Sequence, residues 1–277
     1  MATDRIDAAR VQDLGALTGD VLLFGGAYSN LQATEAMLAE AESLGIPVEN
    51  RIFTGDAIAY CGNPLQTWDL VAREAAVCVA GNCERQLETD AADCGCGFEE
   101  GSTCDALSDG WYGFARARVA GDKDLQAAFA ACPDMAVFSH HGLRYVVIHG
   151  GATDRARFLW PASTPSDFTQ EIDAIQSMIG PVDGVISGHS GIAFERQIGR
   201  VHWINAGAIG MPPHDGRPMT RYAVLSDDDV RIHRLSYDAT AARQAMEAAG
   251  LIQGYHLSLT TGVWPSEDVL PVALRRA

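Results

Sequence analysis

The stretch Ile52-Phe53-Thr54-Gly55-Asp56 joins the end of a short apolar strand to a glycine and a carboxylate. The pattern recurs three times, because Asn82, His149 and His189 also follow apolar runs and lie beside glycine. Ligands bind beyond the carboxyl ends of strands in an open α/β sheet, and glycine lets the backbone approach a ligand closely. The pattern therefore predicts one site that gathers all four side chains.

Each of the four residues also has a simpler interpretation. Asp and Asn before turns commonly cap helices or form Asx turns, and a His at a strand end is commonly a satisfied surface or core residue. Repetition at four strand ends favours a shared site. A carboxylate, an amide oxygen and two imidazoles make a mixed ligand set that suits Mn, Fe or Zn, and not a structural zinc site of four cysteines.

The order of apolar runs around these residues indicates an α/β fold. In the first half, short strands alternate with helical patterns, which favours parallel strands; we expect strands at 21–24, 51–53 and 76–80 and helices at 31–44 and 65–73. In the second half, a hairpin turning at His140-His141-Gly142 precedes a helix and a run of strands. We expect these strands at 135–138, 143–148, 184–187, 192–198, 201–205, 221–225 and 230–235, with helices at 172–179 and 240–248.

Composition narrows the class of protein. The net charge is −16, from 20 basic and 36 acidic residues, which argues against a nucleic-acid partner because phosphate contacts need clustered Lys and Arg. No run reaches the roughly 20 apolar residues of a membrane span, and residues 1–17 lack the apolar core of a secretory signal. We therefore expect a cytoplasmic protein, in which the seven cysteines bind metal or are buried and do not form disulfides.

The ordered blocks resemble the calcineurin-like metallophosphoesterase family. Gly55-Asp56, Gly81-Asn82-Cys83-Glu84, His149-Gly150 and Gly188-His189 follow the order of its motifs. The segments 54–64 and 205–212 resemble a bacterial branch that includes phosphodiesterases and diadenosine tetraphosphatase-like proteins. The resemblance covers about residues 20–236 and implies a two-sheet α/β/β/α sandwich with a two-metal site at one edge. It also implies that Asp56, Asn82, His149 and His189 hold one of the two metals.

The motifs of the other metal position are broken. Where the family has Asp and His in its first block, this chain has Gly26 and Tyr28, and Gly191 replaces the second His of the last block. The resemblance therefore implies one intact metal position and one that keeps only the bridging Asp56. Tyr28 could ligate a ferric ion as phenolate, or it could fill the vacated space, which is the simpler interpretation.

Two functions fit this pattern. The first is a metal-dependent phosphoric ester hydrolase, of phosphodiesterase or phosphatase type, with one divalent Mn, Fe or Zn per chain and low activity. The alternative is a non-catalytic module that binds phosphate or a nucleotide on the same fold. In either case the expected partner is a small phosphorylated molecule, with neither nucleic acid nor membrane.

Further polar residues near the motifs are candidates for catalysis and substrate binding. Cys83 stands where the family has a His that assists the leaving group, and a thiol is a poorer acid at neutral pH; Glu84 could act in catalysis or orient a ligand. Candidates for substrate binding are Tyr28, Asn30, Arg217 and Arg221.

Residues 84–121 are rich in Gly, Asp and Cys, and we expect an irregular insertion loop there. Its Cys94, Cys96 and Cys104 could hold a second metal or make the loop a redox or metal sensor, although their spacing lacks a paired C-x₂-C motif. We expect a single domain over residues 1–277, with a C-terminal packing arm at about 250–277.

Overall fold

The computed structural model describes residues 4–227 and 229–276. One sheet has six strands in the order β1-β5-β6-β7-β9-β8. Their bounds are Val11–Leu17 for β1, Met135–His140 for β5, Leu143–Val147 for β6, Gly184–Ser187 for β7, Phe194–Ile198 for β8 and Val201–Asn205 for β9. Strands β6, β7 and β9 are mutually parallel, so their carboxyl ends lie at one edge.

The second sheet has five strands in the order β11-β10-β2-β3-β4. Their bounds are Val21–Phe24 for β2, Arg51–Phe53 for β3, Val77–Cys78 for β4, Thr220–Ser226 for β10 and Asp229–Leu235 for β11. Strands β2, β3 and β4 are parallel and β10 pairs with β2 in the antiparallel sense. The loops after β2, β3 and β4 therefore leave the sheet at the same edge.

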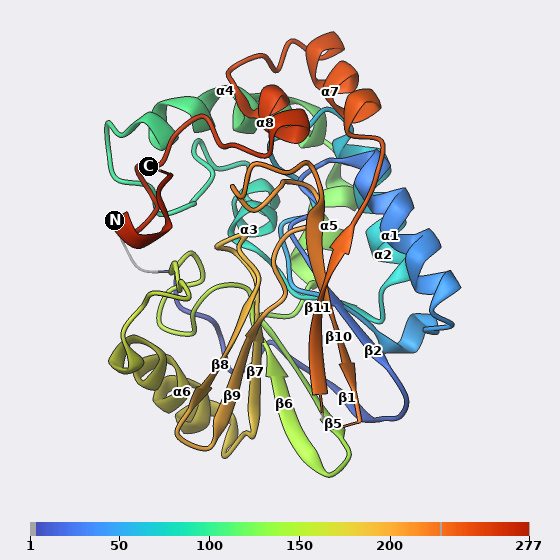
Figure 1. The fold of residues 1–277 in the computed structure, drawn as a ribbon, viewed down its shortest axis with the longest axis vertical. Helices are drawn as coiled ribbons and strands as arrows, with labels where there is room; N and C mark the ends of the chain where they lie inside the picture. Colours follow the sequence, from blue (N-terminus) through green and yellow to red (C-terminus); the bar gives the residue numbers. More distant parts are fainter. Residues whose placement is uncertain (1–3, 228, 277) are drawn as a thin grey trace.

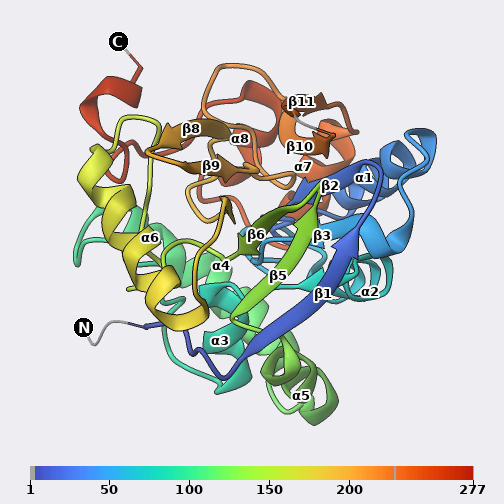
Figure 2. The same ribbon diagram turned by 90° about the horizontal axis from the view of Figure 1, so that it is seen from below.

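Helices cover the outer faces of the paired sheets. Figure 2 shows α6 on one side and α1 and α2 on the other, while Figure 1 shows α4, α7 and α8 gathered beyond one end of the strands. The helices are α1 Leu31–Ser43, α2 Pro64–Glu74, α3 Asn82–Glu88, α4 Thr103–Val119, α5 Lys123–Ala131, α6 Pro165–Ile179, α7 Ala239–Ala248 and α8 Tyr255–Thr261, with short 3₁₀ turns at Val48–Asn50 and Val272–Leu274. Among the described residues, no helix combines the length and apolarity that a membrane span requires.

Strand β2 explains the layering. Its side chains alternate, as a strand's must: Val21 and Leu23 enter the core between the two sheets, whereas Leu22 and Phe24 enter the core beneath the helices of the second sheet. A third core packs α6, through Phe168 and neighbours, on the first sheet. All four β2 residues are fully buried. Three cores separate four layers, which confirms the predicted α/β/β/α sandwich.

Most predicted elements are confirmed. The strands expected at 21–24, 51–53, 184–187 and 201–205 have the predicted bounds, and the hairpin turns at His141-Gly142. Strand β1 was not predicted, because it is an edge strand whose side chains are mostly exposed or half-buried and whose sequence lacks a regular apolar pattern.

The irregular loop predicted at residues 84–121 is wrong in its secondary structure. Most of α3 and all of α4 lie within it, and only the segment between them lacks regular structure. Helix α4 begins at an N-cap in which the side chain of Ser102 accepts a hydrogen bond from the backbone N–H of Asp105. It buries Trp111, Tyr112 and Ala115. Gly and Asp residues on its other faces made this helical pattern hard to recognise in the sequence. The expected C-terminal arm contains α8.

Candidate metal centre

His149 lies at the centre of the four side chains that the strand-end pattern singles out. Its Nε2 atom is 3.2 Å from Asp56 Oδ2, 3.1 Å from Asn82 Oδ1 and 3.1 Å from His189 Nδ1. Asp56 follows β3, His149 follows β6 and His189 follows β7, whereas Asn82 is the first residue of α3. The carboxyl ends of strands from both sheets thus bring together the four residues predicted to ligate metal.

Hydrogen bonding determines which way the imidazole of His149 presents its lone pair. Its Nδ1 lies 2.7 Å from the carbonyl oxygen of Thr54, which can only accept, so Nδ1 carries the proton. The Nε2 lone pair of the neutral ring then faces a carboxylate oxygen and an amide oxygen. Lone pairs this close repel one another unless a cation lies among them. A backbone carbonyl that fixes the tautomer in this way is the usual support of a metal-binding His.

Asn82 is oriented by the same logic. Its Nδ2 donates to the carbonyl oxygen of Cys94 at 2.9 Å and to Cys96 Sγ at 3.3 Å. The amide oxygen is thereby turned toward His149. Both ends of a buried side chain are in use, so the segment after α3 sets the direction of one ligand.

Glu84 holds the loop that carries Asp56. Its buried carboxylate accepts hydrogen bonds from the backbone N–H groups of Asp56 at 2.9 Å, Ala57 at 2.8 Å and Gly81 at 2.8 Å. Asp56 needs this support because its φ is +59°, a conformation that is unfavourable for residues other than glycine. Gly81 is required beside it, since a Cβ there would overlap the Asp56 carboxylate. Glu84 therefore positions a ligand, which is one of the two roles expected for it, and a catalytic role stays a prediction.

His189 is held by a ring contact and by the hydrogen bonds of its loop. The ring of Phe158 lies against it with centroids 4.3 Å apart. The side chain of Asn205 donates to the carbonyl oxygen of Gly188 at 2.7 Å and to Ser190 Oγ at 3.0 Å, which fixes the loop on either side of His189. Burial, together with the nearby His149, lowers the pKa of His189 to about 3. The ring is therefore neutral at pH 7, as a metal ligand must be.

The remaining charges suit a cation. Burial alone would raise the pKa of Asp56, but His149 brings it below its ordinary value, so the carboxylate is ionised. Burial alone would lower the pKa of His149, but Asp56 raises it above the ordinary value. A proton or a metal ion at Nε2 therefore satisfies the same lone pairs. Within the described residues, Asp56, His149 and His189 form the one cluster of three or more His, Cys, Asp or Glu side chains suited to a metal.

Two solved structures share this architecture. A metallophosphoesterase from Sphaerobacter thermophilus is 18% identical, with a TM-score of 0.68, over 89% of this chain and 100% of its own. A hypothetical protein from Pyrococcus horikoshii OT3 is 12% identical, with a TM-score of 0.69, over 89% of this chain and 99% of its own. The chain has the metallophosphoesterase fold. No family model and no curated protein matches it.

Tyr28 fills the part of the metallophosphoesterase fold where the sequence motifs are broken. A Cβ at Gly26 would lie 2.8 Å from Tyr28 Cζ and 3.0 Å from its hydroxyl, and a Cβ at Gly191 would lie 3.8 Å from that hydroxyl. The phenol thus occupies the space between the two glycines. Burial and the Asp56 carboxylate raise the pKa of Tyr28 well above its ordinary value, so the hydroxyl keeps its proton. The position of the ring between Gly26 and Gly191 favours the space-filling interpretation over a phenolate ligand.

Cys83 is no neutral-pH acid in this metallophosphoesterase fold. Its side chain is 1% exposed. Burial raises the pKa of the thiol well above its ordinary value, and Asp56 and Glu84 raise it further. A thiol that neither reaches solvent nor ionises does not support the catalytic role expected for Cys83.

Of the four residues expected to bind substrate, Asn30 and Arg221 are engaged in other contacts. Asn30 caps α1, since its Oδ1 accepts from Ala33 N at 3.1 Å, and its Nδ2 donates to Gly210 O at 2.9 Å. Arg221 pairs with Asp215, and Arg217 is exposed on the same loop; neither lines the pocket beside His189. Tyr28 does line that pocket. The two contacts of Asn30 occupy both ends of its amide, and substrate binding by Asn30, Arg217 and Arg221 stays a prediction.

The cysteine predictions also need correction. Cys94 and Cys96 form a disulfide, so they cannot both be thiolate ligands of a second metal, and the expectation of no disulfide is wrong. Cys104 is a free, buried thiol on α4. Three residues that position the site were not predicted: Thr54, Phe158 and Asn205. Of these, only Asn205 had a signal, because it ends an apolar strand and precedes Ala206-Gly207.

Proposed function

We propose that this protein is a metal-dependent phosphoric ester hydrolase with a single divalent ion, Mn, Fe or Zn, held by Asp56, Asn82, His149 and His189. The observation that carries the proposal is the convergence of three lone-pair donors, from Asp56, Asn82 and His189, on the Nε2 lone pair of His149, whose tautomer is fixed by Thr54. Bound there, the ion would supply Lewis-acid polarisation of a phosphoryl group. The protein's own residues orient the ligands and exclude other charges.

Slow turnover follows from what surrounds the site. The Tyr28 hydroxyl, which stays protonated, can donate a hydrogen bond to a phosphoryl oxygen but cannot replace the charge of a second ion. The Cys83 thiol, whose pKa is raised by burial, is a weak acid and therefore a poor proton donor to a leaving group. The same two facts favour, as a second candidate, a non-catalytic module that binds a phosphorylated ligand. Under either function we propose a single domain, a cytoplasmic location and a small phosphorylated partner, since a net charge of −16 disfavours nucleic acid.

Metal content and turnover test the proposal together. Elemental analysis of wild type purified with Mn²⁺ should give about one equivalent per chain. His189→Ala should hold none, because the two oxygen ligands and the one imidazole that remain bind the ion weakly. His202→Ala is the matched control, since His202 lies on β9 and pairs with Glu195; it should keep its metal. Wild type without metal would refute the proposal.

Hydrolysis separates the two candidates. The wild type with Mn²⁺ should cleave bis-(p-nitrophenyl) phosphate above the blank that contains Mn²⁺ alone, and His149→Ala should not. Metal binding without cleavage of this ester or of a nucleotide panel would favour the binding module.

A further inference from the structure

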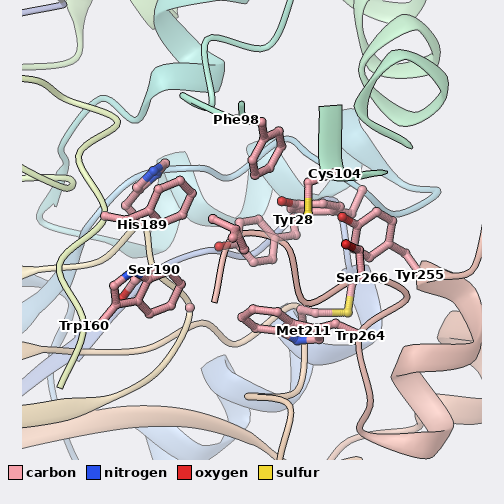
Figure 3. Close-up of a pocket in the computed structure, with 14 residues that line it drawn as sticks. Tyr28, Phe98, Cys104, Trp160, His189, Ser190, Met211, Tyr255, Trp264 and Ser266 are labelled. Atoms are coloured by element: carbon pink, nitrogen blue, oxygen red, sulfur yellow. The ribbon is translucent and has the colours of Figure 1, made fainter. Parts of the chain in front are cut away.

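A pocket of mostly aromatic side chains opens directly beside His189. It is lined by 14 residues from the loops after β2, β3, β6, β7 and β9, together with the segment before α4, α4 itself and the C-terminal arm. Figure 3 shows Phe98, Tyr255, Trp264 and Trp160 around a central space, which Tyr28 and His189 also border. The segments outside the sandwich therefore turn an open sheet edge into a walled pocket.

The chemistry of the wall excludes a charged occupant. None of the 14 lining residues is Lys, Arg, Asp or Glu; the polar ones are neutral hydroxyl, thiol and imidazole groups. A charge taken from water into such a wall would find no counter-ion, which is costly. An apolar ring or alkyl group would gain its burial free energy there and could stack on the aromatic side chains. The wall is thus suited to an uncharged apolar group.

The wall is also held in place before any ligand arrives. Phe158 stacks on Trp160 with centroids 5.3 Å apart and on His189 at 4.3 Å. Trp264 is fixed at two points: its backbone N–H donates to His214 Nδ1 at 2.8 Å, and its Nε1–H donates to Pro212 O at 2.6 Å. Preorganised aromatic walls reduce the entropic cost of binding.

Size limits the occupant further. The cavity volume is about 50 Å³, well below the several hundred Å³ of a pocket that buries a drug-sized ligand. A nucleoside does not fit, and a single ring would keep part of its edge at the mouth.

We propose that this pocket binds a small, uncharged apolar substituent, a single ring or a short alkyl group, of a phosphoric ester whose phosphoryl group lies at the metal centre. The phosphoryl half of this inference rests on the proposed function; the pocket half does not. The substrate class is then a small aryl or alkyl phosphoester, and polyphosphates and nucleotides are poor ligands.

A matched pair of probes isolates the substituent. Phenyl phosphate and methyl phosphate carry the same phosphoryl group, so ligand-observed NMR titrations with Mn²⁺-loaded protein should give a phenyl phosphate affinity about tenfold higher. Pyrophosphate, which would bring charge into the pocket, should bind no better than methyl phosphate. Equal affinity for phenyl and methyl phosphate, or tighter binding of pyrophosphate, would overturn the inference.

Variants test the wall. Phe98→Ala removes a half-buried ring from the pocket and should bring the two affinities together. Phe114→Ala removes a half-buried ring of α4 that does not line the pocket and should leave the difference intact. Phe98→Tyr, which keeps the ring, covers the case in which the alanine variant fails to fold, and should retain the preference.

An experiment without metal distinguishes failure of the proposed function from failure of the pocket inference. Benzyl alcohol carries the ring without a phosphoryl group and should bind metal-free wild type but not Phe98→Ala. If benzyl alcohol binds while Mn²⁺ does not, the proposed function fails and the apolar pocket stands. If Mn²⁺ binds and benzyl alcohol does not, the pocket inference fails and the metal centre stands.

Discussion

At the scale of single residues, the site depends on groups that orient the ligands as much as on the ligands. Thr54 fixes the tautomer of His149, Asn205 fixes the loop of His189, and Glu84 supports the strained backbone at Asp56. Replacing such a supporting residue commonly lowers metal affinity by about 10–100-fold. The ligands alone, grafted onto another sheet edge, would lack this geometry.

Glu84→Gln tests the supporting role. The amide retains one oxygen acceptor but turns an NH₂ group toward backbone N–H donors, so the Asp56 loop should loosen and Mn²⁺ affinity should fall about 10–100-fold. Glu88→Gln on the same helix is the control, because Glu88 only pairs with Arg85 near the surface. Isothermal titration with Mn²⁺ measures both. Unchanged affinity in Glu84→Gln would contradict the role.

At the scale of elements, short continuous apolar runs carried the prediction where a strand is buried on both faces. Strands β3, β7 and β9 were predicted with their bounds because nearly all their side chains are buried, and β6 by its apolar run. Helix α4 was not predicted, because glycines and acidic residues on its exposed faces interrupt the helical pattern of its buried aromatic side chains. The metal ligands were found because each follows a strand, whereas the pocket wall comes from segments distant in sequence that only tertiary structure brings together.

The imidazole of His214 forms two of the hydrogen bonds that hold the C-terminal arm. His214 accepts from Trp264 N at 2.8 Å through Nδ1, and its Nε2 donates to Glu267 Oε1 at 2.6 Å. His214→Ala should therefore release the arm, at a cost of about 1–3 kcal/mol in the free energy of unfolding. Limited proteolysis should cleave after residue 262, while the metal content stays the same.

His233→Ala, on β11 and stacked on Tyr222, is the control for this experiment. Proteolysis of His214→Ala at the rate of wild type would show that the other contacts of the arm, among them the Trp264 Nε1–Pro212 O hydrogen bond, are enough to hold it.

At the scale of the whole molecule, Asp134 ties distant parts of the chain together. Its carboxylate, 3% exposed, lies 3.0 Å from Arg155 Nη2 and 2.5 Å from Arg85 Nη2. It also accepts from the backbone N–H of Asp7 at 2.8 Å. The N-terminal segment, α3 and the segment between β6 and α6 thus meet at one buried anion.

Asp134→Asn should lower the free energy of unfolding by about 3 kcal/mol at pH 7, because buried arginines lose their counter-ion. Burial alone would raise the pKa of Asp134, but Arg155 brings it below its ordinary value. A lowered pKa in the folded state means that this contribution is present above pH about 4 and is lost as the pH falls through the folded-state value. Urea denaturation at a series of acidic pH values should therefore show that the free energy of unfolding falls less steeply with decreasing pH in the variant than in wild type.

Asp173→Asn on the exposed face of α6 is the control. It should keep the free energy of unfolding of wild type at pH 7 and its dependence on acidic pH. Equal stability of Asp134→Asn and wild type at pH 7 would mean that the arginines find other partners.

The ring of Tyr28 between Gly26 and Gly191 also constrains how this chain can change. An Asp introduced at position 26 would collide with the phenol, and its Cβ would also lie 2.7 Å from that of Ala208. A single substitution toward two-metal chemistry is therefore penalised until Tyr28 is replaced by a smaller side chain. In any chain that carries this tyrosine, the aromatic side chain must therefore be replaced before a carboxylate can be accommodated at position 26.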